Sequence, residues 1–99
     1  MDEIRVIARA LARAEKEEQL RNTLVEMLTP RAEQGCRLYE LYESNNRGLF
    51  YFYEEWESPD ALDRHMETPH YKQLMQNIRD LLEVALKSMF WIRSVIENP

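Results

Sequence analysis

The sequence predicts an α+β fold, one domain over residues 1–99 whose helices and strands follow the order βαββααβ. Three observations predict it. Several segments alternate apolar and polar residues with the two-residue period of strands. Two Ser/Thr-Pro pairs mark the starts of helices. A chain of 99 residues with only two glycines has room for one compact unit and few long loops.

The first segment, 4–12, is predicted to be a strand. One phase is apolar and the other mixes apolar residues with arginines: Ile4, Val6, Ala8, Ala10 and Ala12 against Arg5, Ile7, Arg9, Leu11 and Arg13. We expect the mixed phase to meet a partly polar space such as a pocket. After this strand come acidic residues, which suit the start of a helix. Leu20, Leu24, Met27 and Leu28 then recur at helical spacing. Together they predict a helix over 16–33, ended by Gly35.

A hairpin is predicted next, because residues 36–44 and 49–57 both alternate and the residues between them, Asn45-Asn46-Arg47-Gly48, tolerate the positive φ of a tight turn. Both phases of the second strand are aromatic. One holds Leu49, Tyr51 and Tyr53, and the other holds Phe50, Phe52 and Trp56. Neither face of the hairpin is therefore suited to water.

Ser58-Pro59-Asp60 and Thr68-Pro69-His70 each combine an N-cap hydroxyl with a proline at the first helical position. They predict two successive helices. The first is short, with Leu62 and Met66 on one side, and the second carries an apolar stripe: Tyr71, Leu74, Met75, Ile78, Leu81, Leu82 and Ala85. Residues 89–96 are rich in aromatic and β-branched residues, which predicts a last strand.

These elements indicate a ferredoxin-like sandwich, with helices on one face of a four-stranded, mainly antiparallel sheet. The other face would then expose apolar and aromatic side chains. The economical way to cover it is a second copy of the chain, so the sequence predicts a homodimer.

Composition excludes several classes of function. The formal net charge of −5, with 13 basic residues scattered among acids, disfavours nucleic acid as a partner. The single Cys36 can form no internal disulfide, and no metal-ligand spacing is present, so we expect no metal site. No segment has the roughly 20 apolar residues of a membrane span, and the acidic amino terminus does not resemble a signal peptide. We expect a cytoplasmic protein.

Several short segments, in this order and spacing, together resemble the antibiotic biosynthesis monooxygenase (ABM) family. They are Val6-Ile7-Ala8-Arg9, Lys16-Glu17-Glu18-Gln19-Leu20, Gly35-Cys36-Arg37-Leu38-Tyr39-Glu40-Leu41, Tyr53-Glu54-Glu55-Trp56-Glu57-Ser58, Ala61-Leu62, His65 and Thr68-Pro69-His70-Tyr71. The resemblance covers more than three quarters of the chain. It departs at the turn Arg13-Ala14-Glu15, where many relatives have a Pro-Gly pair, which would alter the shape of that loop.

The resemblance implies a dimeric α+β barrel with a pocket between each sheet and its helices. Members of the family include oxygenases that act on phenols or quinols without metal or flavin, haem-degrading enzymes and isomerases of small signalling compounds. The haem-degrading branch relies on an Asn on the first strand, a Trp on the short helix and an iron-ligating His. Here no Asn lies on the first strand, His65 occupies the short helix and Met75 stands at the ligand position. Haem degradation is therefore disfavoured, and no cofactor is expected.

A cofactor-free oxygenase needs a base, a dry pocket and a dipole that stabilises the anion of its substrate. His65 titrates near neutral pH and is the predicted catalytic base; the alternative is a partly exposed helix histidine. Trp56 would stack on a flat substrate or belong to the core. Tyr39 would donate a hydrogen bond to a substrate oxygen, or be an ordinary buried tyrosine.

Glu54 shares the apolar phase of Trp56 and must be hydrogen-bonded, paired with an arginine such as Arg9, or functionally perturbed. His70 would bind substrate or fix the corner between the two helices, the structural role being favoured at a helix start. Cys36 is expected to be a small buried apolar residue, since no neighbouring cation favours a thiolate.

Three functions follow. The first is a cofactor-independent monooxygenase acting with O₂ on a small hydroxylated aromatic or quinol. The second is an isomerase or tautomerase of a small signalling or metabolic compound. The third is a non-catalytic dimer that binds a ligand in a stress response. In each the partner is a small molecule, held by a homodimer.

Overall fold

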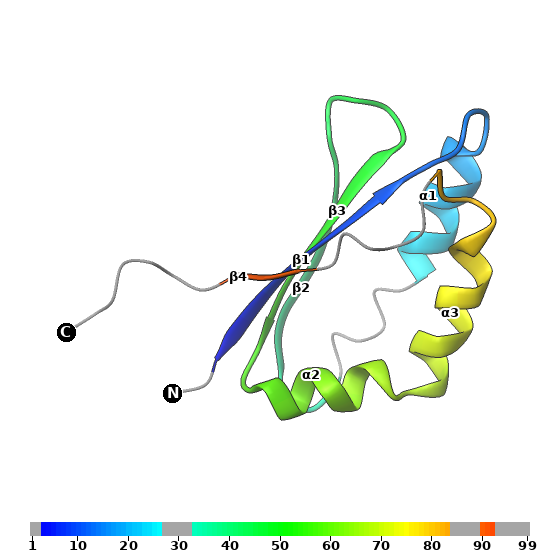
Figure 1. Ribbon diagram of the computed structural model, residues 1–99. Helices are drawn as coiled ribbons and strands as arrows, with labels where there is room; N and C mark the ends of the chain where they lie inside the picture. Colours follow the sequence, from blue (N-terminus) through cyan, green and yellow to red (C-terminus); the bar gives the residue numbers. More distant parts are fainter. Residues whose placement is uncertain (1–2, 27–32, 84–89, 93–99) are drawn as a thin grey trace.

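The computed structural model describes residues 3–26, 33–83 and 90–92. It confirms the α+β class and the predicted order of elements. Along the chain these are β1 (Ile4–Leu11), α1 (Glu17–Val25), β2 (Cys36–Glu43), β3 (Leu49–Trp56), α2 (Pro59–Met66), α3 (Pro69–Arg79) and β4 (Phe90–Ile92) (Figure 1). Within the described residues, no helix is both long and apolar enough to cross a membrane.

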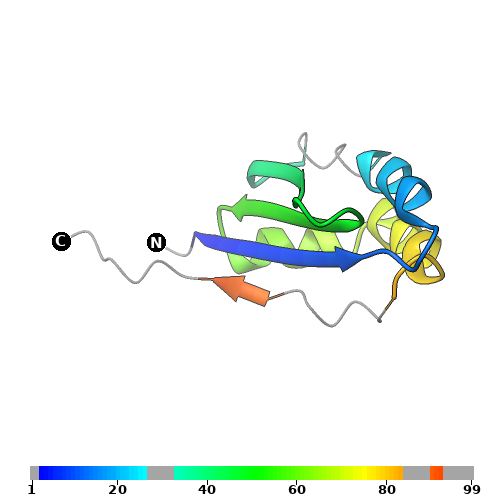
Figure 2. The ribbon, with the colours of Figure 1, turned by 90° about the horizontal axis from the view of Figure 1, so that it is seen from above.

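The four strands form one antiparallel sheet in the order β2-β3-β1-β4. Figure 2 shows them side by side, with β4 next to β1 at one edge. The register places Ala8 opposite Phe52 and Val6 opposite Glu54. Because side chains alternate along a strand, Glu54 lies on the same face as Val6 and Ala8.

The three helices lie on one side of the sheet (Figure 1). The core forms between these layers, where the apolar phases of β1 and β3 are buried together with apolar residues of the helices: Val6, Ala8, Ala10, Phe50, Phe52, Trp56, Leu20, Leu24, Leu62, Leu74 and Ile78. The second phase of β1 lies on the face away from the helices. The expectation that this arginine-containing phase faces a pocket is wrong, because the cavity described below lies on the alanine side.

Both predicted N-caps are confirmed. The Ser58 hydroxyl accepts a hydrogen bond from the Ala61 backbone N–H at 3.2 Å, and the Thr68 hydroxyl accepts one from the Tyr71 N–H at 3.1 Å. Each cap satisfies a backbone donor that the first helical turn leaves unpaired. Together they fix where α2 and α3 begin.

Two predicted boundaries differ from the structure. The first helix ends at Val25 rather than 33, with 27–32 outside the described residues. The stripe of α3 stops at Arg79. Leu81 and Leu82 are buried, but they follow the helix and extend the pairing of β1, with a bridge between Ala12 and Leu82. Ala85 and the outer parts of the predicted strand 89–96 lie outside the described residues.

Gly35 does not end a helix but makes the turn before β2, at a φ of +88°. A Cβ there would lie 2.6 Å from the Ala61 Cβ. In the hairpin turn only Gly48 has positive φ. The turn that departs from the pattern of relatives holds Glu15 at a φ of 71°, in the left-handed region that glycine favours.

Candidate functional site

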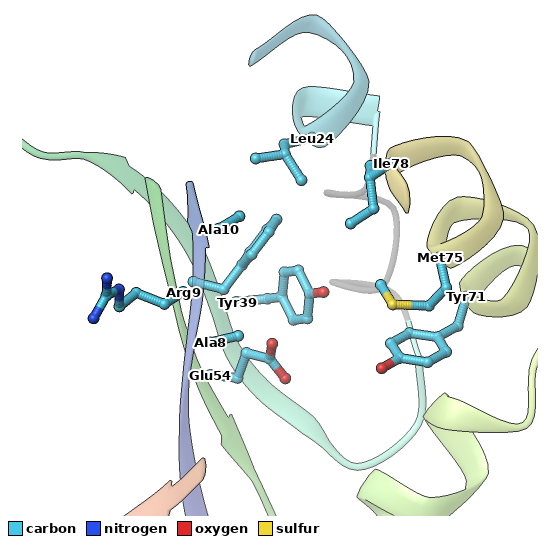
Figure 3. Close-up of a pocket in the computed structure, with 10 residues that line it drawn as sticks. Ala8, Arg9, Ala10, Leu24, Tyr39, Glu54, Tyr71, Met75 and Ile78 are labelled. Atoms are coloured by element: carbon cyan, nitrogen blue, oxygen red, sulfur yellow. The ribbon is translucent and has the colours of Figure 1, made fainter. Parts of the chain in front are cut away.

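A small cavity lies between the sheet and the helices (Figure 3). Its volume is about 20 Å³, which is room for roughly one water molecule. An aromatic ligand therefore enters only if the lining side chains move apart. Its lining comes from β1, β2, β3, α1 and α3: Ala8, Arg9, Ala10, Leu24, Tyr39, Phe52, Glu54, Tyr71, Met75 and Ile78. Apolar residues predominate, with one carboxyl group and two tyrosines among them.

The cavity exists because β1 presents small side chains where the helices would otherwise close onto the sheet. Ala8 and Ala10 are both buried, and each offers only a methyl group. Leu24 approaches from α1, and Met75 and Ile78 approach from α3 (Figure 3). Space is thus left above the middle of the sheet.

Glu54 is the carboxyl group that lines this space, and its surroundings shift its pKa strongly. Glu54 is 4% exposed, and one of its carboxylate oxygens accepts a hydrogen bond from the Trp56 Nε1–H at 2.9 Å. Burial raises the pKa of Glu54 to about 7, against the lowering effect of the Trp56 bond, and the charge of Glu33 raises it further. A carboxyl group with this pKa can both take and return a proton near neutral pH.

Tyr39 and Tyr71 point their hydroxyl groups into the same space as the Glu54 carboxyl group (Figure 3). Burial raises the pKa of both phenols, and the charge of Glu54 raises both further. The two hydroxyls therefore stay protonated at neutral pH. Protonated phenols can donate hydrogen bonds to an anionic oxygen.

His65 is buried behind the cavity rather than lining it. The residue is 2% exposed, so the alternative of a partly exposed histidine is wrong. Its ring lies over the Trp56 ring with centroids 4.7 Å apart and planes at 31°. The rings of Tyr39 and Tyr71 meet it edge-on at 5.8 Å and 4.9 Å. Trp56 itself is fully buried in the core, and it touches the site through its N–H and its ring.

Arg9 and His70 are not brought to the cavity by their side chains. Arg9 is exposed, and Figure 3 shows its side chain pointing away across the sheet, so its backbone alone lines the space. Glu54 therefore shares no face with Arg9, and of the alternatives the hydrogen bond from Trp56 and the perturbed pKa describe it. His70 is exposed near the start of α3 and does not line the cavity.

Glu33 is a site residue that the sequence reasoning missed. Its two carboxylate oxygens lie 3.1 Å and 3.2 Å from the Nδ1 atom of His65. The two residues are 32 positions apart, so no periodicity signals the contact. Elsewhere in the described chain, no group of three or more His, Cys, Asp or Glu residues is arranged to hold a metal ion.

Comparison with known proteins identifies the family. The family model described as "Antibiotic biosynthesis monooxygenase" (ABM) matches residues 3–77. The chain belongs to the ABM family. All the residues that line the cavity, except Ile78, lie within the part that matches.

Individual ABM relatives agree with this assignment. Over 80 residues the chain is 42% identical to a Mycobacterium tuberculosis protein named "Putative monooxygenase Rv0793", which covers 80% of this chain and 79% of that protein. The solved structure of Rv0793 matches with a TM-score of 0.89 and 35% identity over 99% of this chain and all of that one. Pseudomonas aeruginosa PA3566 matches with a TM-score of 0.87 and 28% identity over 97% of each chain. Family and relatives support a general monooxygenase-like function.

Proposed function

We propose that this ABM protein is a cofactor-independent monooxygenase that uses O₂ to oxidise a small hydroxylated aromatic compound or quinol, with Glu54 as the base. The observation that carries the proposal is a carboxyl group with a pKa of about 7 in an apolar cavity flanked by two protonated tyrosines. A base is most effective when its pKa lies near the working pH. Glu54 replaces His65 in this role because Glu54 lines the cavity.

The reaction begins when the Glu54 carboxylate takes the proton of a phenolic hydroxyl. The resulting phenolate is electron-rich enough to pass an electron to O₂. Oxygen then bonds to a ring carbon that carries hydrogen, and loss of water leaves a second carbonyl. Overall a phenol with a free para C–H and one O₂ give a quinone and one water. The substrate supplies four electrons and O₂ accepts four.

Tyr39 and Tyr71 would stabilise the negative charge that develops on the substrate oxygen. Donors placed in a water-poor site are more effective than the same donors in water, because they need no reorganisation as the charge forms. The apolar lining serves the same end. It holds the flat face of an aromatic ligand and excludes solvent protons from the anion.

We propose that the active form is a homodimer. The face of the sheet away from the helices carries apolar and aromatic side chains that are only partly buried within one chain, among them Ile7, Leu11, Tyr51 and Tyr53. A second copy laid on this face would remove them from water. Sedimentation equilibrium tests this assembly: a monomer that persists at micromolar concentration would contradict it.

Oxygen uptake tests the reaction. Chelator-treated protein is mixed with a panel of quinols and anthrols, and uptake is compared between wild type and Glu54→Gln. The matched control is Glu67→Gln, which makes the same chemical change at an exposed ion pair with Lys72. Uptake that falls in Glu54→Gln but not in Glu67→Gln supports the proposal. Equal uptake by all three proteins would remove Glu54 from the mechanism.

A base in an apolar cavity also suits an isomerase or tautomerase, which needs proton transfer but not O₂. Turnover that persists without oxygen would select that function. A compound that stays bound through purification without being converted would favour a ligand-binding dimer instead.

A further inference from the structure

The proposed reaction leaves one partly buried hydrogen bond without a role, the contact between Glu33 and His65. Glu33 comes from the segment before β2 and His65 from α2. Both carboxylate oxygens of Glu33 are within hydrogen-bond distance of the same ring nitrogen, Nδ1. The Glu33 side chain is 27% exposed, whereas that of His65 is 2% exposed. The pair therefore links the protein surface to the layer behind the cavity.

This contact fixes the protonation pattern of the imidazole. An ionised carboxylate can only accept hydrogen bonds, so Nδ1 must carry the proton and donate it to Glu33. Burial lowers the pKa of His65, against the raising effect of Glu33, while the charge of His70 lowers it further. The ring is therefore neutral at pH 7, and its other nitrogen, Nε2, is a lone-pair acceptor.

Nε2 is the unusual atom of this arrangement. It is buried and has no hydrogen-bond partner among the described residues of the protein. Buried polar atoms in native proteins are nearly always paired, so one that is not requires an explanation, and a role in a functional site is one such explanation. The two ring nitrogens point in different directions, so Nε2 points away from Glu33. It belongs to a ring that touches Tyr39 and Tyr71, both of which line the cavity.

A second connection runs from the same pair to the proposed base. The His65 ring stacks on Trp56, and the Trp56 N–H donates to Glu54. The side chains of His65 and Trp56 thus connect Glu33 to Glu54 through a series of direct contacts. The charge of Glu33 also acts directly on Glu54, raising its pKa.

We infer that Glu33 is a positioning residue of the site: it holds the buried His65 with Nδ1 protonated, so that Nε2 accepts a hydrogen bond from a hydroxyl group of the ligand once the ligand displaces the tyrosine rings that separate His65 from the cavity. The inference rests on the proposed function for the class of ligand, a hydroxylated aromatic compound. Orientation of a histidine through its second nitrogen by a carboxylate is the arrangement used wherever one tautomer is required.

Nitrogen-15 NMR of the histidine side chains tests, without any turnover, whether Glu33 fixes the tautomer of His65. With His70 assigned from a His70→Gln variant, wild-type His65 should show only the Nδ1–H tautomer near neutral pH. Glu33→Ala should populate the Nε2–H tautomer. Glu33→Gln keeps an acceptor oxygen and should keep the Nδ1–H form. A wild-type His65 protonated on Nε2, or a tautomer unchanged in Glu33→Ala, overturns the assignment.

Titration with 1-naphthol, a hydroxylated aromatic probe, tests whether Nε2 of His65 accepts a hydrogen bond from a ligand hydroxyl. Its hydroxyl should shift the Nε2 signal of wild-type His65, and naphthalene, which lacks the hydroxyl, should not. An Nε2 signal that stays unmoved up to the solubility limit of 1-naphthol overturns the acceptor role. If Nε2 moves while no compound of the quinol panel is oxidised, the inference stands and the proposed oxidation fails.

Kinetics separate positioning from mere stability. Glu33→Ala should lower kcat/KM about 10- to 100-fold, the range found when a residue that orients a functional group is removed. Glu33→Gln should move the acid limb of the pH profile to lower pH, because the charge that raises the pKa of Glu54 is gone. Glu67→Gln is again the control. Folding is checked by melting temperature, and a kcat/KM of Glu33→Ala equal to that of wild type would contradict the positioning role.

Discussion

Replacing Glu54 with glutamine should remove a specific dependence of stability on pH. Glu54 has a pKa of about 7 in the folded protein against an ordinary value of 4.5. The folded state therefore holds a proton that the unfolded chain has already released. The stability this proton contributes is fully present below pH 4.5 and is lost as the pH rises through 7. Glutamine keeps the acceptor for the Trp56 N–H and cannot ionise.

The size of the effect follows from the same two values. A rise from 4.5 to about 7 corresponds to about 3 kcal/mol of unfolding free energy, most of which falls between pH 5 and pH 8.5. His65 acts in the opposite direction. Its pKa is lowered, so its contribution is lost as the pH falls below its ordinary value of 6.5. That contribution is common to both proteins and cancels in their difference.

Urea denaturation at fixed protein concentration measures this difference. The free energy of unfolding of wild type should decline relative to Glu54→Gln by about 2 to 3 kcal/mol from pH 5 to pH 8.5. The m-values of the two proteins should agree, which shows that the same transition is compared. Parallel pH dependences in the two proteins would refute the assignment of a buried, protonated carboxyl group at Glu54.

Three further changes give separate tests. Trp56→Phe removes the N–H that lowers the pKa of Glu54, so the acid limb of the oxygen-uptake profile should move to higher pH, and a limb that stays in place would count against this hydrogen bond. Tyr71→Phe removes a hydroxyl from the cavity and should lower kcat/KM about 100-fold with little change in melting temperature. Gly35→Ala should destabilise the protein by about 2 kcal/mol or more, because φ is +88° and the added Cβ meets Ala61 at 2.6 Å. Thermal melting measures that loss, and an unchanged midpoint would mean that the turn can rearrange.

Local patterns predicted the elements of this fold well. The phases of β3 were correct because a strand buried on one face repeats every two residues, and Phe50, Phe52 and Trp56 are all buried together. The starts of α2 and α3 were correct because Ser58 and Thr68 cap them through their own side chains. Ends were harder. Leu81 and Leu82 keep a helical spacing but are buried by pairing beside β1.

The candidate site was predicted in part. Glu54 was identified as a site residue because it lies in the apolar phase of its strand, and Tyr39 because its hydroxyl can donate a hydrogen bond to a substrate oxygen; both line the cavity. Arg9 lies in the opposite phase of β1, and that alternation places its side chain across the sheet from Glu54. The partner of His65 could not be found, since the contact with Glu33 is created only when two distant segments meet.

The alanines of β1 limit the size of the cavity, whereas the reactive groups of the cavity lie on other elements. Ala8 and Ala10 contribute only methyl groups and backbone to its wall, whereas every ionisable or hydroxyl-bearing side chain comes from another element. A longer side chain at either alanine would reduce the size of the ligand that fits while leaving the proton acceptor itself in place. The residues that limit ligand size and the residues that carry the reactive groups thus lie on different elements, so each set can be substituted without replacing the other.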